Sequence, residues 1–349
     1  MRPRKTENRD LPPNVYRRKR KRKSGKVWIG YYYQTPSGKE ISLGTDFDLA
    51  RLKWAELESQ EKPLDLRTMK GIFARYVRDI LPKKAPRTQK DNFAELRKLS
   101  AVFDDAPIDA ITPAMIAQYR DKRSAKTRAN REIALLSHIF NTAREWGLTE
   151  KANPCLGIRK NKERPRDYYA TDAVWAAVYV EAVPELKEAM DLAYLTGQRP
   201  ADVLAMRQDD IDGDFLLVKQ GKTGKRLRIL LKMDGQLNSL GLLIERMIER
   251  NKKHISLHFI LNQYGKRVSQ EMLRNRWDDA RETARLKAIA GKQPEFAAQI
   301  ARFQFRDIRP KAASEIVSVA DASLLLGHSE EGITERVYRR IGAIAKPAK

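Results

Sequence analysis

The sequence predicts a multidomain protein with a small α+β module, an all-α module and a larger, mainly α module that contains a small antiparallel β-hairpin. Three observations lead to this fold class. β-forming residues gather near the N-terminus, helical apolar stripes fill the middle, and one hairpin pattern interrupts the helices that follow. With 349 residues, the chain is long enough for two or three separate cores. We place the domains at residues 1–62, 63–160 and 161–349.

The first segment predicts a small β-sheet and one helix behind a basic arm. The arm is the run "YRRKRKRKSGK", which elsewhere could be a solvated tail or a localisation signal but here leads directly into structure. "KVWIGYYYQ" and "EISLG" predict two strands around the turn "TPSGK", and "DFDLARLKWAELES" predicts a helix with an acidic first turn. Such a module is suited to DNA docking, with the candidate residues Arg17, Arg18, Lys19 and Arg20.

The second segment predicts helices throughout. "TMKGIFARYVRDIL" carries a helical apolar stripe, and "TPAMIAQYRDKR" begins with Thr112 as N-cap and a proline in the first turn. The next helix, "AKTRANREIALLSHIFNTAREWG", ends at Gly147. Its first turns present Lys126, Arg128 and Arg131 away from the apolar stripe. A solvated face and a phosphate-binding face explain these cations equally well.

The third segment follows a charged linker, "GIRKNKERPRD", and contains two stretches with isolated cations at breaks in structure. In "LTGQRPADVLAMR", Gly197 and Pro200 interrupt a helix around Arg199, which holds its guanidinium rigidly for a phosphate. In "FLLVKQGKTGKRLRILL", two strands meet at a glycine-containing turn beside Lys222, whose flexible ammonium can reach a ligand. Either stretch alone is common in basic proteins.

Two further stretches near the C-terminus carry a second set of cations and a tyrosine. "FQFRDIRPKAAS" places Arg306 and Arg309 three residues apart, on the same side of a helical turn. "GHSEEGITERVYRR" surrounds Tyr338 with arginines and includes His328. Taken alone, an aromatic residue at helical spacing is more often a core contact than a functional group.

Composition narrows the possible partners. The formal net charge of +24 makes nucleic acid the default partner and an acidic membrane surface a weaker alternative. We find neither an apolar run that could span a bilayer nor a signal peptide. The single cysteine, Cys155, cannot form an internal disulfide and fits a reducing cytosol. The four histidines form no zinc-like cluster, and "HISLHFIL" reads as a strand.

In this order, the stretches resemble the signature of the tyrosine recombinase (phage integrase) family. Its pattern is an arginine in "LTGxR", a hairpin lysine, an "HxxR" pair, an "LGH" histidine and a C-terminal tyrosine. "RDIR" departs from "HxxR", because an arginine stands where the first histidine belongs, and arginine cannot act as a base at neutral pH. Asp202 falls where the family often has an acid that braces the first arginine. The implied catalytic residues are Arg199, Lys222, Arg306, Arg309, His328 and the nucleophile Tyr338.

The resemblance implies a lambda-integrase-like architecture: an arm-type DNA-binding domain, a helical core-binding (SAM-like) domain and a tyrosine recombinase catalytic fold. It also implies cleavage and rejoining of DNA through a 3′-phosphotyrosyl link and a Holliday junction, without metal, ATP or another cofactor. The implied partners are double-stranded core-type and arm-type sites, three further copies of the chain, and possible host DNA-bending and excisionase proteins. We expect an integrase of a phage or other mobile element, in the cytoplasm of a bacterial host and on the nucleoid when DNA-bound.

The chemistry of these residue types agrees with that implication. A tyrosine has an ordinary pKa of about 10 and must lose its proton as it attacks. Fixed arginine and lysine donors stabilise the negative charge that develops on a pentavalent phosphate. The family's hairpin lysine protonates the departing 5′ oxygen. Two alternatives stay open: a type IB topoisomerase-like enzyme, and a DNA-binding protein that has lost catalysis, for which Arg306 is the hint.

Overall fold

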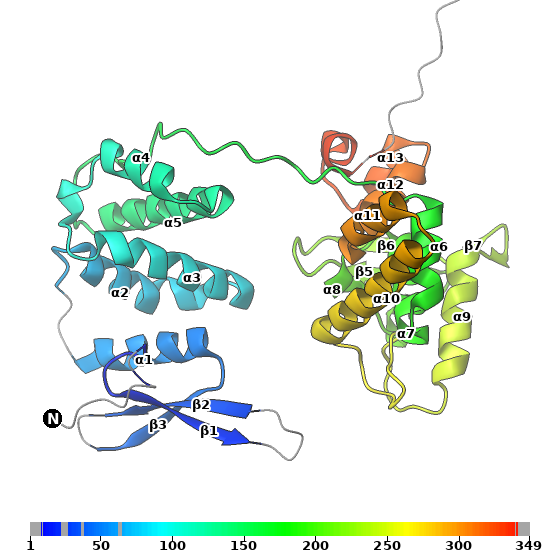
Figure 1. Cartoon of the computed structure of the whole chain (residues 1–349), viewed down its shortest axis with the longest axis horizontal. Coiled ribbons are helices and arrows are strands. Elements are labelled where there is room, and N and C mark those ends of the chain that lie inside the picture. Colours follow the sequence, from blue (N-terminus) through cyan, green and yellow to red (C-terminus); the bar gives the residue numbers. More distant parts are fainter. Residues whose placement is uncertain are drawn as a thin grey trace, which may run out of the picture. The chain divides into compact units, whose positions relative to one another are not determined.

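The computed structural model describes residues 8, 10–21, 27–35, 38–61, 65–338 and 340, and it divides the chain into two compact units, 1–164 and 165–349 (Figure 1). The predicted fold class is confirmed: a small sheet with one helix, then a helical bundle, then a mainly helical unit with small antiparallel sheets. The three-domain division remains a prediction. None of the described helices is both long and apolar enough to cross a membrane.

The first unit opens with an antiparallel sheet that packs on one helix. The strands are β1 (Val15–Lys21), β2 (Val27–Gln34) and β3 (Glu40–Gly44), in the order β1-β2-β3, and the helix is α1 (Phe47–Glu61). Tyr33, Leu43 and Ala50 form the centre of their shared core. The turn "TPSGK" is predicted between the second and third strands, and two of its residues, 36 and 37, lie outside the described part of the chain.

The basic run differs from the predicted arm. Residues 15–21 form strand β1, which pairs along its length with β2, whereas residues 22–26 lie outside the described part. The strand is stabilised across the sheet: Arg18 lies 4.7 Å from the Tyr32 ring centroid and pairs with Glu40 at 2.7 Å. Arg17 pairs with Asp10 and lies 6.0 Å from the Tyr31 ring. Contacts with these tyrosines thus stabilise the strand, although lysine and arginine have only a weak preference for strands.

The rest of the first unit is helical. Its elements are α2 (Met69–Asp79), η2 (Leu81–Lys83), α3 (Pro86–Phe103), η3 (Ile108–Ala110), α4 (Pro113–Lys122) and α5 (Lys126–Glu145). The Thr112 hydroxyl accepts a hydrogen bond from Met115 N at 3.3 Å, which confirms the predicted N-cap. After α5, Gly147 adopts φ +70°, as a helix-terminating glycine requires. The predicted linker has neither helix nor strand, and Asn161 N donates to Asn130 Oδ1 at 2.8 Å.

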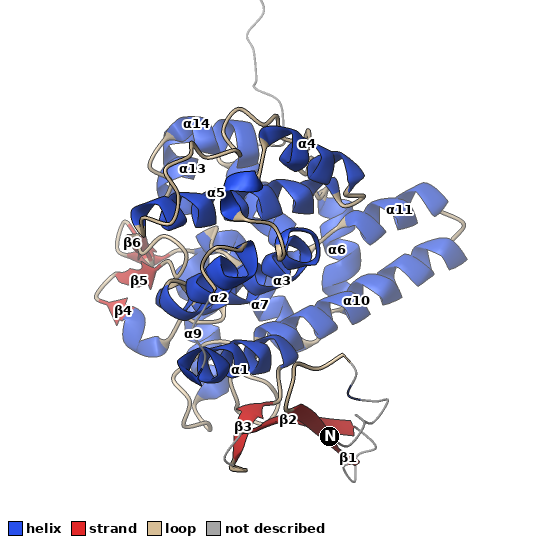
Figure 2. Cartoon of the chain, turned by 90° about the vertical axis from the view of Figure 1, so that its left-hand side faces the viewer, coloured by secondary structure: helices blue, strands red, loops and turns tan. Residues whose placement is uncertain are grey.

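The second unit has a helical core, with its three-stranded sheet at one side, and α10 and α11 pair as a helical hairpin (Figure 2). Fully buried Ala189, Met190 and Leu192 of α7 contribute to this core, as does the edge-to-face pair Trp277–Phe303, whose ring centroids are 4.8 Å apart. The helices are α6 (Asp172–Glu181), α7 (Pro184–Thr196), α8 (Pro200–Val203), η4 (Gln208–Asp210), α9 (Ser239–Asn251), α10 (Gln270–Ala290), α11 (Pro294–Arg302), η5 (Phe305–Asp307), α12 (Ile308–Glu315), α13 (Val319–Leu326), α14 (Glu331–Ile333) and the π-helix η6 (Thr334–Tyr338).

The sheets of this unit are small and antiparallel. The strands are β4 (Ile211–Asp212), β5 (Phe215–Lys219), β6 (Arg226–Leu230), β7 (Lys232–Met233) and β8 (Gln236–Leu237). β4, β5 and β6 form one sheet, and β5 and β6 are the predicted hairpin. The stretch "HISLHFIL" is not a strand: His258 and Leu261 form only isolated bridges, and the Asn251 side chain binds the Phe259 carbonyl at 2.8 Å. Among the described residues, no neighbouring strand offers this stretch a continuous ladder.

Candidate active site

The break in the helix around Arg199 is built as the sequence predicts. Helix α7 ends at Gly197 with φ +63°, and α8 begins at Pro200, so that Arg199 has extended backbone between them. A side chain at Gly197 would also meet Leu326 at 3.1 Å, because the end of α13 packs against this turn. Both the left-handed backbone and this close approach require glycine here.

Arg199 is held by two neighbours and remains partly exposed. Its Nη1 donates to Gln220 Oε1 at 3.1 Å and lies 3.9 Å from Asp202 Oδ2. Asp202 is buried, and its Oδ1 accepts a hydrogen bond from Gly221 N at 2.9 Å. Asp202 therefore links Arg199 to the β5–β6 turn, in agreement with the bracing role that the resemblance implied. The arginine's own side chain keeps 22% exposure, which leaves it accessible to a ligand.

Arg309, on α12, is a buried cation for which the described residues provide no counter-ion. It is only 4% exposed, donates from Nη1 to Gly197 O at 2.5 Å and from Nη2 to Leu326 O at 2.7 Å, and no carboxylate in the described part forms an ion pair with it. Burial and the nearby Arg199 charge lower its pKa to about 10. Its buried Nε has no hydrogen-bond partner among the described residues. A cation with a spare donor and no carboxylate is suited to an external anion.

His328 follows Gly327, whose φ of +68° ends α13, and it contacts Arg309 directly. Its Nε2 lies 3.2 Å from Arg309 Nη2, and its Nδ1 lies 2.7 Å from the Thr334 hydroxyl. A guanidinium only donates, so Nε2 accepts and the proton of the neutral ring sits on Nδ1, toward Thr334. Burial and the charges of Arg309, Arg199 and Lys225 lower the pKa of His328 to about 4, so the ring is neutral at pH 7.

Tyr338 ends the π-helix η6 and lies against both of these groups. Its ring centroid is 4.7 Å from that of His328 and 5.1 Å from the Arg309 guanidinium. The segment is fixed to α12 by Ser314, whose hydroxyl donates to Tyr338 O at 3.3 Å and accepts from Arg340 N at 2.7 Å. The structure therefore gathers Arg199, Arg309, His328 and Tyr338 from three separate stretches of sequence.

Lys222 is not brought into this cluster. It lies exposed in the turn between β5 and β6, and within the described residues it contacts neither Arg309, His328 nor Tyr338. The turn itself is tied to the site on both sides of Lys222. Gln220 binds Arg199, and Lys225 Nζ donates to the His328 carbonyl at 2.9 Å. The backbone of the turn is therefore held in place, while the side chain of Lys222 is exposed.

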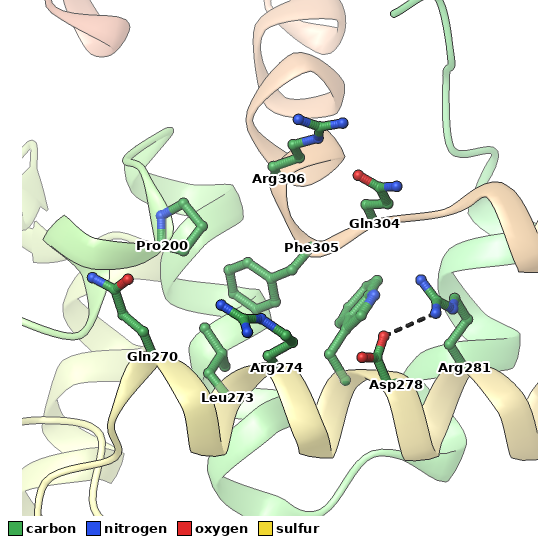
Figure 3. A pocket seen from close by; sticks show the side chains of 10 residues that line it. Pro200, Gln270, Leu273, Arg274, Asp278, Arg281, Gln304, Phe305 and Arg306 are labelled. Carbon is green, nitrogen blue, oxygen red and sulfur yellow. Dashed lines mark hydrogen bonds and ion pairs between the residues drawn. The ribbon is translucent and has the colours of Figure 1, made fainter. Parts of the chain in front are cut away.

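Arg306 and Arg309 differ from the predicted pair on one side of a helical turn. Arg306 belongs to the 3₁₀ turn η5 and is exposed, whereas Arg309 is buried in α12. The reason is Asp307, which accepts from Gln304 N at 2.8 Å and from Arg166 at 2.5 Å and so tightens the turn. Arg306 points away from α10 at the rim of a cavity of about 480 Å³ (Figure 3). The cavity is lined by Pro200, Gln270, Leu273, Arg274, Trp277, Asp278, Arg281, Gln304, Phe305 and Arg306.

The candidate DNA-binding residues of the first unit lie in two groups. On β1, the alternation of a strand divides Arg17 and Lys19 from Arg18 and Arg20, and only Arg17 is half-buried. On α5, Lys126 Nζ donates to Asp121 O at 3.0 Å and Arg131 lies 3.7 Å from Glu163. Arg128 is exposed. DNA binding by both groups stays a prediction.

Sequence reasoning missed the polar residues that connect the site. Gln198 and Gln220 are fully buried and bound to each other at 2.8 Å, and Thr334 and Ser314 hold His328 and the tyrosine segment. Of these residues, only Gln220 could have been found from the sequence. It stands two residues after Val218 and four after Leu216, so the alternation of strand β5 places its side chain on the buried face, where a polar group needs a hydrogen-bond partner. No metal-binding group of three histidine, cysteine or acidic side chains occurs among the described residues.

A mainly α unit in which a tyrosine lies beside a buried arginine, with no counter-ion for it among the described residues, has the side chains that transfer of a phosphodiester to tyrosine would need. Sequence comparison identifies the family. The profile of the phage integrase family matches residues 176–343, that of the bacteriophage lambda integrase arm DNA-binding domain matches 1–58, and that of the phage integrase N-terminal domain matches 65–162. The chain belongs to the phage integrase family.

Relatives and solved structures extend this similarity over nearly the whole chain. The integrases of Escherichia phage HK022 and Escherichia phage lambda are 26% and 27% identical, each alignment covering 95% of this chain and 94% of the relative. A lambda integrase tetramer bound to a Holliday junction has a TM-score of 0.64 at 23% identity, covering 98% of this chain and 99% of that one. The Tn1549 transposon integrase, with circular intermediate DNA, has a TM-score of 0.57 at 14% identity, covering 79% and 96%. These structures share the fold.

Proposed function

We propose that this protein is a site-specific DNA recombinase, the integrase of a phage or other mobile element. The observation that carries the proposal is the buried Arg309, which has no counter-ion among the described residues and lies beside the Tyr338 ring. A DNA phosphate supplies the missing negative charge, and the same phosphate then lies next to the tyrosine. Membership of the phage integrase family supports this assignment.

In the proposed reaction, Tyr338 attacks the scissile phosphorus. The bond from the tyrosine oxygen to phosphorus forms, the bond from phosphorus to the 5′ oxygen breaks, and the tyrosine proton passes to water during attack. Arg199 and Arg309 donate to the non-bridging oxygens as their charge develops. Lys222 gives its proton to the leaving 5′ oxygen, so the products are a 3′-phosphotyrosyl link and a free 5′-hydroxyl. Attack of another 5′-hydroxyl on this link reverses the step and exchanges strands.

His328 and Arg306 have supporting roles in this proposal. The neutral imidazole of His328, fixed by Thr334, accepts a hydrogen bond from Arg309 and so orients that guanidinium toward the phosphate without adding a positive charge of its own. Arg306 is a phosphate anchor rather than a base, because its guanidinium keeps its proton. Its exposed position at the rim of the cavity leaves it free to reach DNA.

The same proposal includes the DNA and protein partners of this chain. Four copies act on two double-stranded core sites through a Holliday junction, while the first domain binds arm-type sites. The similar structure of a lambda integrase tetramer bound to a Holliday junction supports this stoichiometry. Host DNA-bending and excisionase proteins complete the scheme, which takes place in the cytoplasm of a bacterial host. We also expect the C-terminal tail to pack on a neighbouring copy, and residues 341–349 lie outside the described part.

A covalent trapping experiment tests the proposal. Duplexes from the DNA that flanks the gene, nicked near the crossover, are incubated with the protein and separated under denaturing conditions. The native protein is expected to give a denaturant-resistant protein–DNA band, and Tyr338→Phe is expected to bind the same DNA without giving that band. Adduct formation by Tyr338→Phe would refute the nucleophile. Absence of adduct from the native protein would favour a DNA-binding protein without catalysis, and relaxation without exchange between two marked DNAs would favour a topoisomerase.

A further inference from the structure

The amide of Gln220 is completely buried and uses every hydrogen-bonding position that it has. The residue follows β5 and is 0% exposed. Its Nε2 donates to Gln198 Oε1 and to Leu326 O, both at 2.8 Å. Its Oε1 accepts from Arg199 Nη1 at 3.1 Å and from the Thr223 hydroxyl at 2.8 Å. Two donors and two lone pairs are the full capacity of an amide.

These partners leave only one orientation for the amide. The Arg199 guanidinium can only donate and the Leu326 carbonyl can only accept, so Oε1 must face the arginine and Nε2 must face the carbonyl. A flipped amide would set two donors against each other and two acceptors against each other. The network therefore has a defined direction, from the Arg199 side chain through Gln220 to the residue that precedes Gly327 and His328.

Gln220 contacts two of the stretches that carry the charged residues of the site, and a shared acceptor links it to Arg309. It binds Arg199 directly. It closes the turn that carries Lys222, since Gln220 N donates to Lys225 O at 2.9 Å and Gly224 N donates to Gln220 O at 2.8 Å. It also shares the Leu326 carbonyl with Arg309 Nη2, which donates to that oxygen at 2.7 Å. The side chain of Gln220 thus links Arg199 to the carbonyl that Arg309 binds, and its main chain closes the lysine turn.

Arg199 depends on this contact more than on any other. Within the described part of the chain, Gln220 Oε1 is the one acceptor at hydrogen-bond distance from its guanidinium, and Asp202 Oδ2 is further away at 3.9 Å. Without Gln220, the guanidinium would retain only that longer ion pair and could rotate on its flexible side chain. A donor that is not preorganised stabilises a transition state much less well.

We propose that Gln220 is a positioning residue for DNA cleavage, which acts by holding the Arg199 guanidinium in place. The inference rests on the proposed recombinase function, because it needs a phosphate for Arg199 to meet. Gln220 itself contacts no substrate in this scheme. Its removal changes the geometry of the site without changing its charge.

The test compares single-turnover cleavage of a nicked site by the native protein and by Gln220→Met, which keeps the size of the side chain but none of its hydrogen bonds. Cleavage is expected to slow by about 10- to 100-fold, since a misplacement of about 1 Å can cost that much. DNA affinity is expected to stay within about threefold, because all cations remain. Gln263→Met, at an exposed glutamine, is the matched control and should cleave at the native rate.

A double-mutant cycle separates positioning from a general structural role. In an Arg199→Ala background, Gln220→Met is expected to slow cleavage by less than about threefold, because the residue through which it acts is gone. An equal slowing in both backgrounds, or a native cleavage rate for Gln220→Met, would overturn the inference. If Gln220→Met does not fold, Gln220→Asn enters the same cycle, since it keeps an amide without adding charge but is one methylene too short to reach Arg199 and Leu326 together. Failure of the native protein to form any adduct would instead contradict the recombinase function.

Discussion

At the scale of single residues, the site combines a buried cation with an exposed one. Arg309 is buried and bound to two backbone carbonyls, while Arg306, three residues earlier, is exposed. The family pattern has a histidine at the position of Arg306. If Arg306 anchors the phosphate, the position needs a charge; if it is a poor replacement for a base, the position needs an imidazole.

Substitution of Arg306 distinguishes these two roles. Arg306→Lys keeps the charge but loses the forked donors, so we expect partial cleavage activity, and Arg306→Ala should lose roughly 10²-fold or more. Arg306→His should not exceed the native rate near pH 7. Single-turnover cleavage across pH provides the measurement. A histidine variant that is faster than the native protein would show that the site lacks a proton acceptor, since an imidazole with a pKa of about 6.5 is partly neutral there.

His328 makes the stability of the DNA-free protein sensitive to acid. Its pKa is lowered to about 4 by burial and by the neighbouring cations, whereas an unfolded histidine has a pKa of about 6.5. Between these two pKa values, His328 binds a proton in the unfolded chain but not in the folded one. The contribution of His328 to the free energy of unfolding is therefore complete above about pH 6.5 and is lost as the pH falls toward 4. We expect urea unfolding from pH 7 to 4.5 to show a smaller acid loss for His328→Gln than for the native protein. Identical slopes would contradict the lowered pKa.

At the scale of elements, left-handed glycines end the two helices that meet beside the site. Gly197 ends α7 and Gly327 ends α13. At Gly327 a Cβ atom would lie 2.7 Å from Gln220 Nε2, so this glycine serves both the backbone and the packing of the amide. The close approach joins the end of α13 to the β5–β6 hairpin.

Gly327→Ala should therefore cost more than backbone strain alone. The left-handed conformation costs an alanine about 1–2 kcal/mol, and displacement of Gln220 adds to that cost and slows cleavage. Gly213→Ala is the matched control, because Gly213 has φ +57° and nothing within 4 Å of its Cβ position. Urea unfolding and single-turnover cleavage of both variants provide the comparison. Equal losses of stability and native cleavage by both variants would contradict the packing role of Gly327.

The elements also show how far local patterns predict the structure. The break around Arg199, the Lys222 hairpin and the Thr112 cap depend on neighbours in sequence, and all three were predictable. Strand β1 was not, since its cations are stabilised by tyrosines of β2. "HISLHFIL" has the composition of a strand but lacks a partner strand among the described residues. The Gln220 network was hidden because Leu326 lies 106 residues away along the chain.

At the scale of the whole molecule, the chain divides its positive charge between two compact units. The connecting segment is bound on both sides: Asn161 to Asn130 in the first unit, and Arg166 to Asp307 in the second at 2.5 Å. The proposal gives the units different tasks, with arm-type sites bound by the first domain and cleavage performed by the second unit.

This division of tasks predicts separable effects on binding and cleavage. Replacing the exposed Arg18, Lys19 and Arg20 by glutamine should weaken binding to arm-type DNA and lower the salt slope of that binding by about 0.9 for each phosphate that the variant no longer neutralises. Cleavage of an isolated core site should remain at the native rate. Binding titrations over a range of salt concentrations provide the measurement. An unchanged slope and footprint would show that β1 is not a DNA-binding surface.

The attachment of Tyr338 to α12 has a genetic consequence. Ser314 fixes the tyrosine segment to the helix that carries Arg309, so one polypeptide supplies both the attacking group and the cation beside it. Consider an assembly in which one subunit lacks Tyr338 and another lacks Arg309. Each of these two subunits has an incomplete active site, and neither can supply the missing side chain to the other. Two such alleles, expressed together, are therefore expected not to complement each other, and either one expressed with the native gene is expected to behave as a dominant negative.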